Sequence, residues 1–237
     1  MKLLSPNLSR RVLPVAVAMA VAVALPAAAQ APQEDTADTP YLIYLPSQSP
    51  SVDQEAIVQA LGDLGFNVIT LPYAAETRLE YARRVAAEVR MLTERGVAPG
   101  AITVLGAGTA TSVAILTSAV AGKRQVNYVL LGQCDPLLKV GYRFRMSGRV
   151  LGLRDSADSG SQSCRPLWSD SPKVSDRRDL VVSTGHGAAL FDRPRVEWLQ
   201  PVVEWTGGGR VDVGEIRIGA VENPAGAGGE AALGAGN

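Results

Sequence analysis

The fold is decided by one stretch, Ile102-Thr-Val-Leu-Gly-Ala-Gly-Thr-Ala-Thr-Ser-Val-Ala-Ile115. Its first four residues form the apolar run of a buried strand, Gly106 to Ala110 form a tight turn, and residues 109–121 have the pattern of a helix. Gly108 is at the centre of the turn, and glycine adopts the conformations of tight turns with little strain. The stretch therefore predicts a strand–turn–helix unit.

The rest of the chain repeats this alternation of short apolar strands and helices. Strands are predicted at 41–45, 66–70, 102–105, 126–131, 149–153 and 180–183, and helices at 51–64, 77–95, 109–121 and 194–205. Ser51 and Gln54 have the spacing of a capping box, and Pro201 should kink or split the last helix. Strands that are apolar throughout belong to parallel sheets covered on both faces. We expect a three-layer α/β/α sandwich with a mostly parallel six-stranded sheet over residues 41–207.

The N-terminus has the order of a secretory signal peptide. Lys2, Arg10 and Arg11 precede an apolar run at 12–25, and small residues follow Pro26. The alternative is an uncleaved anchor, but the run is shorter than the ~18 to 20 residues that span a bilayer. We expect a signal peptide at 1–29, a flexible leader at 30–40, and a secreted or periplasmic protein without a stable membrane span.

The composition excludes several functions. Loss of the first 30 residues removes three of the 23 basic residues and none of the 23 acidic ones, which gives a net charge of −3. That balance argues against nucleic acid or an anionic membrane as the main partner. A single histidine and two cysteines indicate no metal cluster, and we expect no cofactor.

The tail at 208–237, rich in glycine and alanine, is predicted to be largely disordered, with one edge strand possible at 210–221.

Cys134 and Cys164 follow two of the predicted strands, at the same end of the sheet. In an exported chain, two cysteines favour a disulfide, although two free thiols are the alternative.

Three segments at the carboxyl ends of strands belong together: the turn at Gly106, the segment Val150-Leu-Gly-Leu-Arg-Asp-Ser-Ala-Asp158, and Gly185-His186-Gly187. In this order the chain resembles the α/β-hydrolase family over residues 41–205. The resemblance implies that the turn after the third strand carries a nucleophile, that Asp158 is the acid and that His186 is the base. Asp155 is close enough to compete with Asp158 for the role of the acid.

The sequence departs from the family pattern at the nucleophile, because Gly108 stands where the serine should be. Glycine has no side chain that can attack a carbonyl. Thr109 is next on the turn, but the residue at that position normally contributes its backbone N–H. Other hydroxyl groups on loops at the same end of the sheet are those of Ser47, Ser49, Ser161 and Ser163.

Three functions remain open. The first is a catalytically impaired, exported protein that binds a small ligand or a cell-envelope protein at the former active site. The second is a serine-type ester hydrolase that uses His186 and Asp158 with an unrecognised nucleophile or with water. The third is an interaction protein that does not use the cleft, in which Asp158 caps a turn and His186 is structural.

Overall fold

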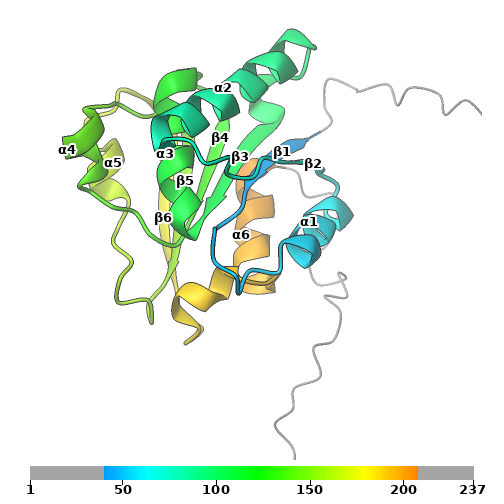
Figure 1. Cartoon of the computed structure of the whole chain (residues 1–237), viewed down its shortest axis with the longest axis vertical. Coiled ribbons are helices and arrows are strands. Elements are labelled where there is room, and N and C mark those ends of the chain that lie inside the picture. The colour runs from blue at the N-terminus through cyan, green and yellow to red at the C-terminus, as the bar shows by residue number, and fades with distance from the viewer. Residues whose placement is uncertain (1–39, 208–237) are drawn as a thin grey trace, which may run out of the picture. The chain divides into compact units, whose positions relative to one another are not determined.

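Within the described part of the chain, six strands lie parallel in one sheet, in the order β2-β1-β3-β4-β5-β6 (Figure 1). The computed structural model describes residues 40–207. The strands are β1 Tyr41–Leu45, β2 Asn67–Thr70, β3 Ile102–Ala107, β4 Asn127–Leu131, β5 Ser147–Asp155 and β6 Lys173–Val182. The expected sandwich of helices around a six-stranded parallel sheet is confirmed.

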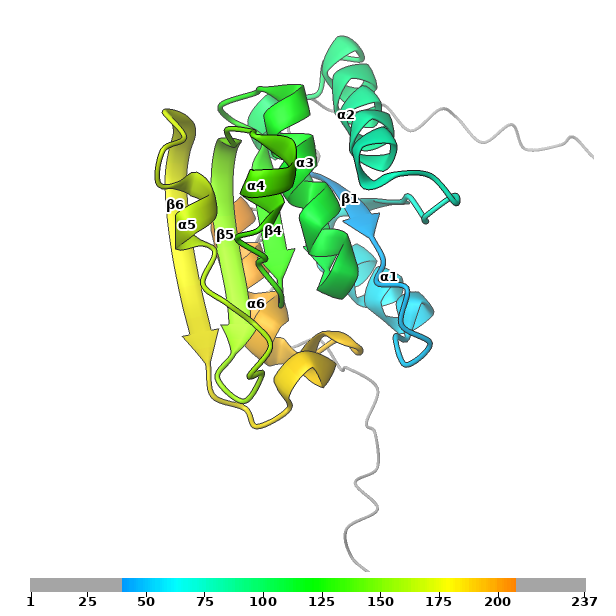
Figure 2. The same cartoon turned by 60° about the vertical axis from the view of Figure 1, so that its left-hand side comes forward.

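Helices cover both faces of this sheet. Their bounds are α1 Gln54–Asp63, α2 Arg78–Glu94, α3 Thr111–Ala121, α4 Leu138–Tyr142, α5 Arg165–Trp168 and α6 Val196–Thr206. Short 3₁₀ helices are η1 Pro99–Ala101, η2 Gly108–Ala110 and η3 Gly187–Phe191. Buried side chains of α2, α3, α4 and α5 pack on one face, and those of α1 and α6 pack on the other (Figures 1 and 2).

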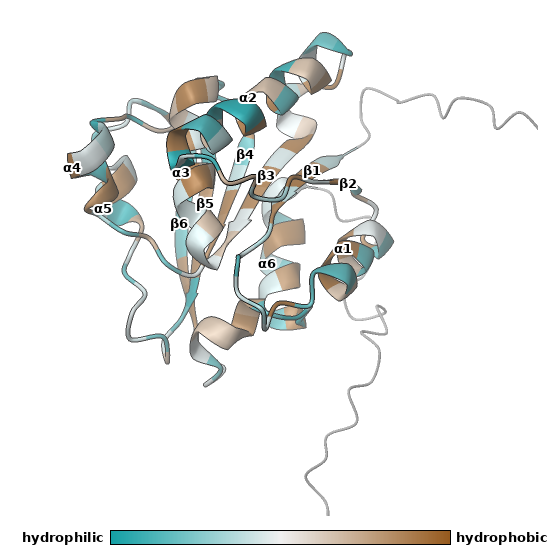
Figure 3. Cartoon of the chain, viewed as in Figure 1, coloured by the Kyte–Doolittle hydropathy of each residue, from teal (hydrophilic) through white to brown (hydrophobic). Residues whose placement is uncertain are grey.

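The pattern of side chains explains these layers. Alternate residues of β1 enter opposite cores, so Ile43 packs with the α2 and α3 side and Leu42 with the α1 and α6 side. The long helix α2 buries one stripe and exposes charged residues elsewhere, and it is coloured in both teal and brown along its length (Figure 3). Its start is held by a capping box between Thr77 and Glu80.

Some predicted boundaries were wrong. Helix α1 begins after Asp53, whose carboxylate accepts a hydrogen bond from the Ala56 backbone N–H at 3.1 Å, so the cap is not at Ser51. The edge strand β6 starts seven residues before the expected strand because its first half is charged and exposed. Helix α6 continues through Pro201, since its buried stripe holds both halves against the sheet.

No helix within residues 40–207 is long and apolar enough to cross a membrane. The predicted signal peptide, most of the leader and the tail with its possible strand at 210–221 lie outside the described residues.

Candidate functional site

The order of the strands brings two loops together at the carboxyl end of the sheet. Strand β3 pairs with β1 on one side and with β4 on the other. The helix after β1 covers one face, and the helix after β3 covers the opposite face. Loops that leave such neighbouring strands in opposite directions open a crevice, which is where parallel α/β sheets bind their ligands. Here the segment after Leu45 faces the turn after Ala107.

The turn is built around two glycines that no larger residue could replace without movement. A Cβ atom added to Gly106 would lie 2.7 Å from the Ala110 carbonyl oxygen and 2.9 Å from Cβ of Ala114, so Gly106 allows helix α3 to approach the strand closely. Gly108 has a φ of +53°. A Cβ atom at Gly108 would also lie 2.9 Å from Oγ of Ser47.

Ser47 is therefore the nearest side chain to the position from which a nucleophile on the turn would project. It is only 9 % exposed. Its Oγ accepts a long hydrogen bond, 3.4 Å, from the Ser49 backbone N–H. The hydroxyl hydrogen of Ser47 has no acceptor among the described residues.

A cavity of about 440 Å³ lies beside Gly108, and we call it the Gly108 pocket. Its wall is mainly apolar and also carries hydroxyl, amide and carboxylate groups. Thr109 and Asp158 contribute to it, as does the strand-end glycine Gly132. The remaining lining residues are Ser47, Ser49, Ser51, Val52, Ala107, Gly108, Gln133, Gly160, Ala188, Ala189, Phe191 and Asp192.

Asp155 ends strand β5 and organises the loop that carries the histidine. One carboxylate oxygen accepts hydrogen bonds from the His186 and Gly187 backbone N–H groups, at 3.1 and 3.2 Å, and from the Thr184 hydroxyl. The other oxygen accepts from the Ala157 backbone N–H at 2.9 Å. The bond from Ala157, with those from Thr184 and the His186 loop, lowers the pKa of Asp155 to about 2. Both carboxylate oxygens of Asp155 are thus used in hydrogen bonds to the loops around it.

Asp158 has an environment that leaves it open to the pocket. One of its carboxylate oxygens accepts a hydrogen bond from the Gly160 backbone N–H at 3.1 Å. The side chain is partly exposed and lines the Gly108 pocket. The two later segments touch here, since a Cβ atom on Gly187 would lie 3.8 Å from Cα of Asp158.

His186 is exposed and is not among the described residues that line the Gly108 pocket. Its ring makes no hydrogen bond within residues 40–207. Of the residues singled out from the sequence, the structure brings Gly108, Thr109 and Asp158 to one cavity. It places His186 on the adjoining loop, two residues before Ala188 of the pocket wall.

A disulfide begins directly after the pocket residues Gly132 and Gln133. It joins Cys134 to Cys164, as expected from the sequence, with the Cα atoms 5.1 Å apart. Gly152 of strand β5 makes room for it, because a Cβ atom there would lie 2.8 Å from Sγ of Cys164. The Ser161 hydroxyl donates a hydrogen bond to the Gly132 carbonyl at 2.8 Å and ties the loop after β5 to the one after β4.

Sequence reasoning did not single out Asp192 and Gln133 for the site, and it treated Ser47 as one loop serine among several. Asp192 follows η3. Burial raises the pKa of the Tyr44 hydroxyl to about 12, and the negative charge of Asp192 contributes to this shift. Loop residues carry no periodic signal, so only the folded arrangement shows which of them share a cavity. Within residues 40–207 there is no group of three or more residues that could hold a metal ion.

Comparisons with known proteins agree with the architecture. No family model matches the sequence, and no curated protein matches it. Among solved structures, a candidate carboxylesterase from Lactobacillus plantarum superposes with a TM-score of 0.52 at 16 % identity, over 72 % of this chain and 89 % of the other.

Two further similar structures have lower TM-scores. MGS-M1, an α/β-hydrolase enzyme from a deep-sea metagenome library, has a TM-score of 0.45 at 14 % identity, over 72 % of this chain and 84 % of the other. An acetyl ester-xyloside bifunctional hydrolase from Caldicellulosiruptor lactoaceticus has 0.44 at 16 % identity, over 72 % and 80 %. The described chain has the α/β-hydrolase fold.

Proposed function

We propose that this protein binds a small ligand in the Gly108 pocket and does not carry out serine-type acyl transfer. The observation that carries the proposal is the turn itself: Gly108 offers no nucleophile, and Ser47 fills the space in front of it. The position of His186 outside the pocket lining also supports it, since a general base must reach the group that it deprotonates.

Two measurements on the purified chain test this proposal. Hydrolysis of 4-nitrophenyl acetate should not exceed that of the His186→Ala variant. In a fragment screen by NMR, the backbone amide signals of Gly108, Thr109 and Gly132 should shift, because all three residues line the cavity. Turnover that disappears in His186→Ala would contradict the proposal.

A second candidate function is an ester hydrolase with Ser47 as its nucleophile, and the 2.9 Å approach of Ser47 Oγ to the Cβ position of Gly108 favours it. In that reaction the Ser47 oxygen attacks the acyl carbon, and His186 takes the hydroxyl proton and returns it to the leaving alcohol. Water then hydrolyses the acyl-enzyme.

A fluorophosphonate probe separates the two functions. The hydrolase would be labelled at Ser47, and Ser47→Ala would abolish the labelling. Ser49→Ala is the matched control because Ser49 lines the same pocket but is exposed. Absence of labelling in the wild-type chain would reject the second candidate and leave the binding function.

We also propose that the protein acts outside the cytoplasm. The basic and apolar N-terminus and the Cys134–Cys164 disulfide support this location. Intact-mass analysis of cell fractions should find a chain that begins after Ala29 in the exported fraction. A full-length chain with two reduced cysteines would show that the location is wrong.

A further inference from the structure

We propose that the ligand of the Gly108 pocket is a small organic cation: an amine with an aryl or other apolar body. This inference rests on the binding function proposed above and adds the chemical class of the ligand. It follows from the charges, the unused hydrogen-bonding groups and the apolar part of one cavity.

The charges on the wall of the cavity favour a cation. Asp158 and Asp192 both line the cavity, and its described lining contains no lysine, arginine or histidine. Neither carboxylate takes part in a salt bridge among the described residues. An anionic ligand would be repelled by two negative charges here, whereas an ammonium group would be attracted.

The polar groups on the wall of the cavity have acceptor positions that no described protein group uses. The Asp192 carboxylate accepts no hydrogen bond from the described residues, and Asp158 accepts only the one from Gly160. Ser47 adds a nine-tenths-buried hydroxyl on the same wall. Within residues 40–207 its oxygen accepts only the long hydrogen bond from the Ser49 N–H, so one lone pair remains for another donor. An ammonium group has three donors and no acceptor, so it fits the free acceptor positions of Asp158, Asp192 and Ser47.

Much of the rest of the cavity wall is apolar. Val52, Ala107, Ala188, Ala189 and Phe191 give the cavity an apolar side. A pocket with an apolar side and a few convergent polar groups orients a ligand that has both characters. A carboxylate ligand would bring a third negative charge beside Asp158 and Asp192.

Three aryl probes of similar size test the inference: benzylamine, benzyl alcohol and benzoate, each titrated into the isotope-labelled protein at pH 7. We expect benzylamine to shift the amide signals of Gly108, Thr109 and Gly132, and to bind about tenfold or more tightly than benzyl alcohol. Benzoate should bind more weakly than the alcohol. Equal binding of the alcohol, tighter binding of benzoate, or no shift with any probe would overturn the inference.

Two variants test whether the preference for the amine comes from the pocket. Asp192→Asn should weaken benzylamine about tenfold while leaving benzyl alcohol unchanged, because it removes charge and preserves shape. The control is Asp63→Asn, which makes the same charge change on the exposed end of α1. An equal effect of the two variants would mean that overall charge, not the pocket, attracts the amine.

The experiments distinguish a wrong ligand class from a wrong binding function. If benzoate or the alcohol shifts the three pocket signals best, the pocket binds ligands but the ligand class is wrong. If the wild-type chain hydrolyses esters in a His186-dependent way, the binding function itself fails. The wild-type probe series also stands alone if Asp192→Asn does not fold.

Discussion

At the scale of single residues, Gly108 is held by two separate constraints. Its φ of +53° is costly for residues with a side chain, and the Ser47 hydroxyl occupies the space that a side chain would need. A substitution at Gly108 therefore meets backbone strain and a steric clash together. The two costs can be separated, because only the second depends on Ser47.

A double-mutant cycle measures that separation. Gly108→Ala should lower the free energy of unfolding by about 2 to 4 kcal/mol in the wild-type background. In a Ser47→Gly background the cost should fall to about 1 to 2 kcal/mol, the backbone term alone. Urea unfolding of the four proteins gives the coupling energy. An equal cost in both backgrounds would mean that Ser47 does not restrict this position.

Asp155 and Asp158 are a matched pair, three residues apart, with opposite roles in the structure. Asp155 is buried and accepts four hydrogen bonds, so Asp155→Asn should lower the free energy of unfolding by about 2 to 4 kcal/mol. Asp158→Asn should cost less than about 1 kcal/mol, because it weakens only one bond at the surface. Equal losses in urea unfolding would contradict this assignment.

The lowered pKa of Asp155 also predicts how stability depends on pH. Its ordinary value is 3.8 and its value in the folded chain is about 2, so the unfolded chain binds the proton more tightly. The stabilisation by this carboxylate is complete above about pH 5 and declines as the pH falls through about 4 to 2. The difference in unfolding free energy between wild type and Asp155→Asn should therefore be smaller at pH 3 than at pH 7. A constant difference would mean that the hydrogen bonds do not favour the charged form.

The glycine of the turn and the acidic segment after the fifth strand could be predicted, because both belong to an ordered motif. The distinct roles of Asp155 and Asp158 could not, since they depend on which carboxylate the backbone of the His186 loop reaches. Asp192 was missed for a related reason. It enters the pocket through the packing of η3 beside helix α1, where its carbonyl accepts a hydrogen bond from the Asp53 N–H at 2.8 Å.

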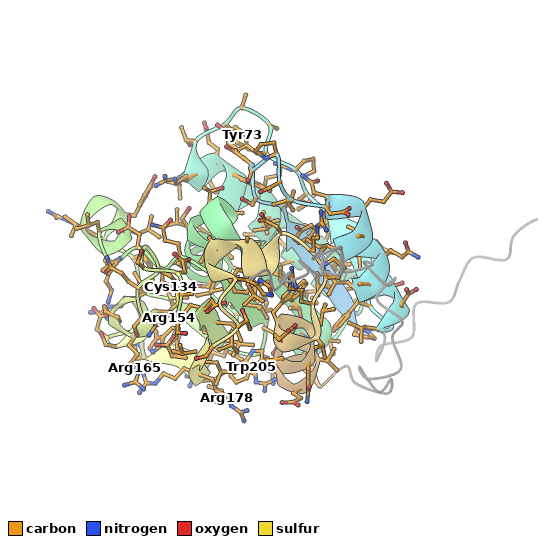
Figure 4. All side chains as sticks on the ribbon, turned by 90° about the horizontal axis from the view of Figure 1, so that it is seen from below. Tyr73, Cys134, Arg154, Arg165, Arg178 and Trp205 are labelled. Atoms are coloured by element: carbon orange, nitrogen blue, oxygen red, sulfur yellow. A yellow bond between two sulfur atoms is a disulfide. The ribbon has the colours of Figure 1, made fainter. Side chains whose placement is uncertain are left out.

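At the scale of elements, the helices and strands with clear periodicity could be predicted and the charged edge could not. Strand β6 has Lys173, Asp176, Arg177, Arg178 and Asp179 in its first seven residues, so it has no apolar signal there. It is a strand because it pairs with β5 along its length. Arg178 lies over the ring of Trp205 from helix α6, 5.5 Å from its centroid (Figure 4), so one of these charged side chains also contacts the helix that covers the sheet.

Helix α2 shows how strongly a local signal can act. The Thr77 hydroxyl accepts a hydrogen bond from the Glu80 N–H at 3.2 Å, and the Glu80 carboxylate accepts one from the Thr77 N–H at 2.8 Å. Thr77→Ala should cost about 0.5 to 2 kcal/mol of stability in thermal or urea unfolding. Thr77→Ser keeps the cap and is the control. If serine and alanine are equally destabilising, the cap is not the source of the loss.

At the scale of the whole molecule, the fold could be predicted because every local pattern agrees with a doubly covered parallel sheet. The helices α4 and α5 are the exceptions, with only five and four residues. They lie between β4 and β6 in the chain (Figure 2). Helix α4 is inside the loop that the disulfide closes, and α5 begins directly after Cys164. Short helices gain little from their own hydrogen bonds, so this region depends on packing and on the covalent link.

The cross-link between Cys134 and Cys164 closes a loop with a sequence separation of 30 residues. Loop-closure entropy in the unfolded chain then predicts a stabilisation of about 3 to 4 kcal/mol. A reducing agent should lower the urea midpoint of the wild-type chain by the corresponding amount and leave a Cys134→Ala/Cys164→Ala double variant unchanged. Because Gly132 and Gln133 lie directly before Cys134 on the pocket wall, reduction should also weaken binding of a pocket ligand. If reduction lowers the midpoint but leaves that affinity unchanged, the strands alone position the wall, and the disulfide stabilises the fold without shaping the site.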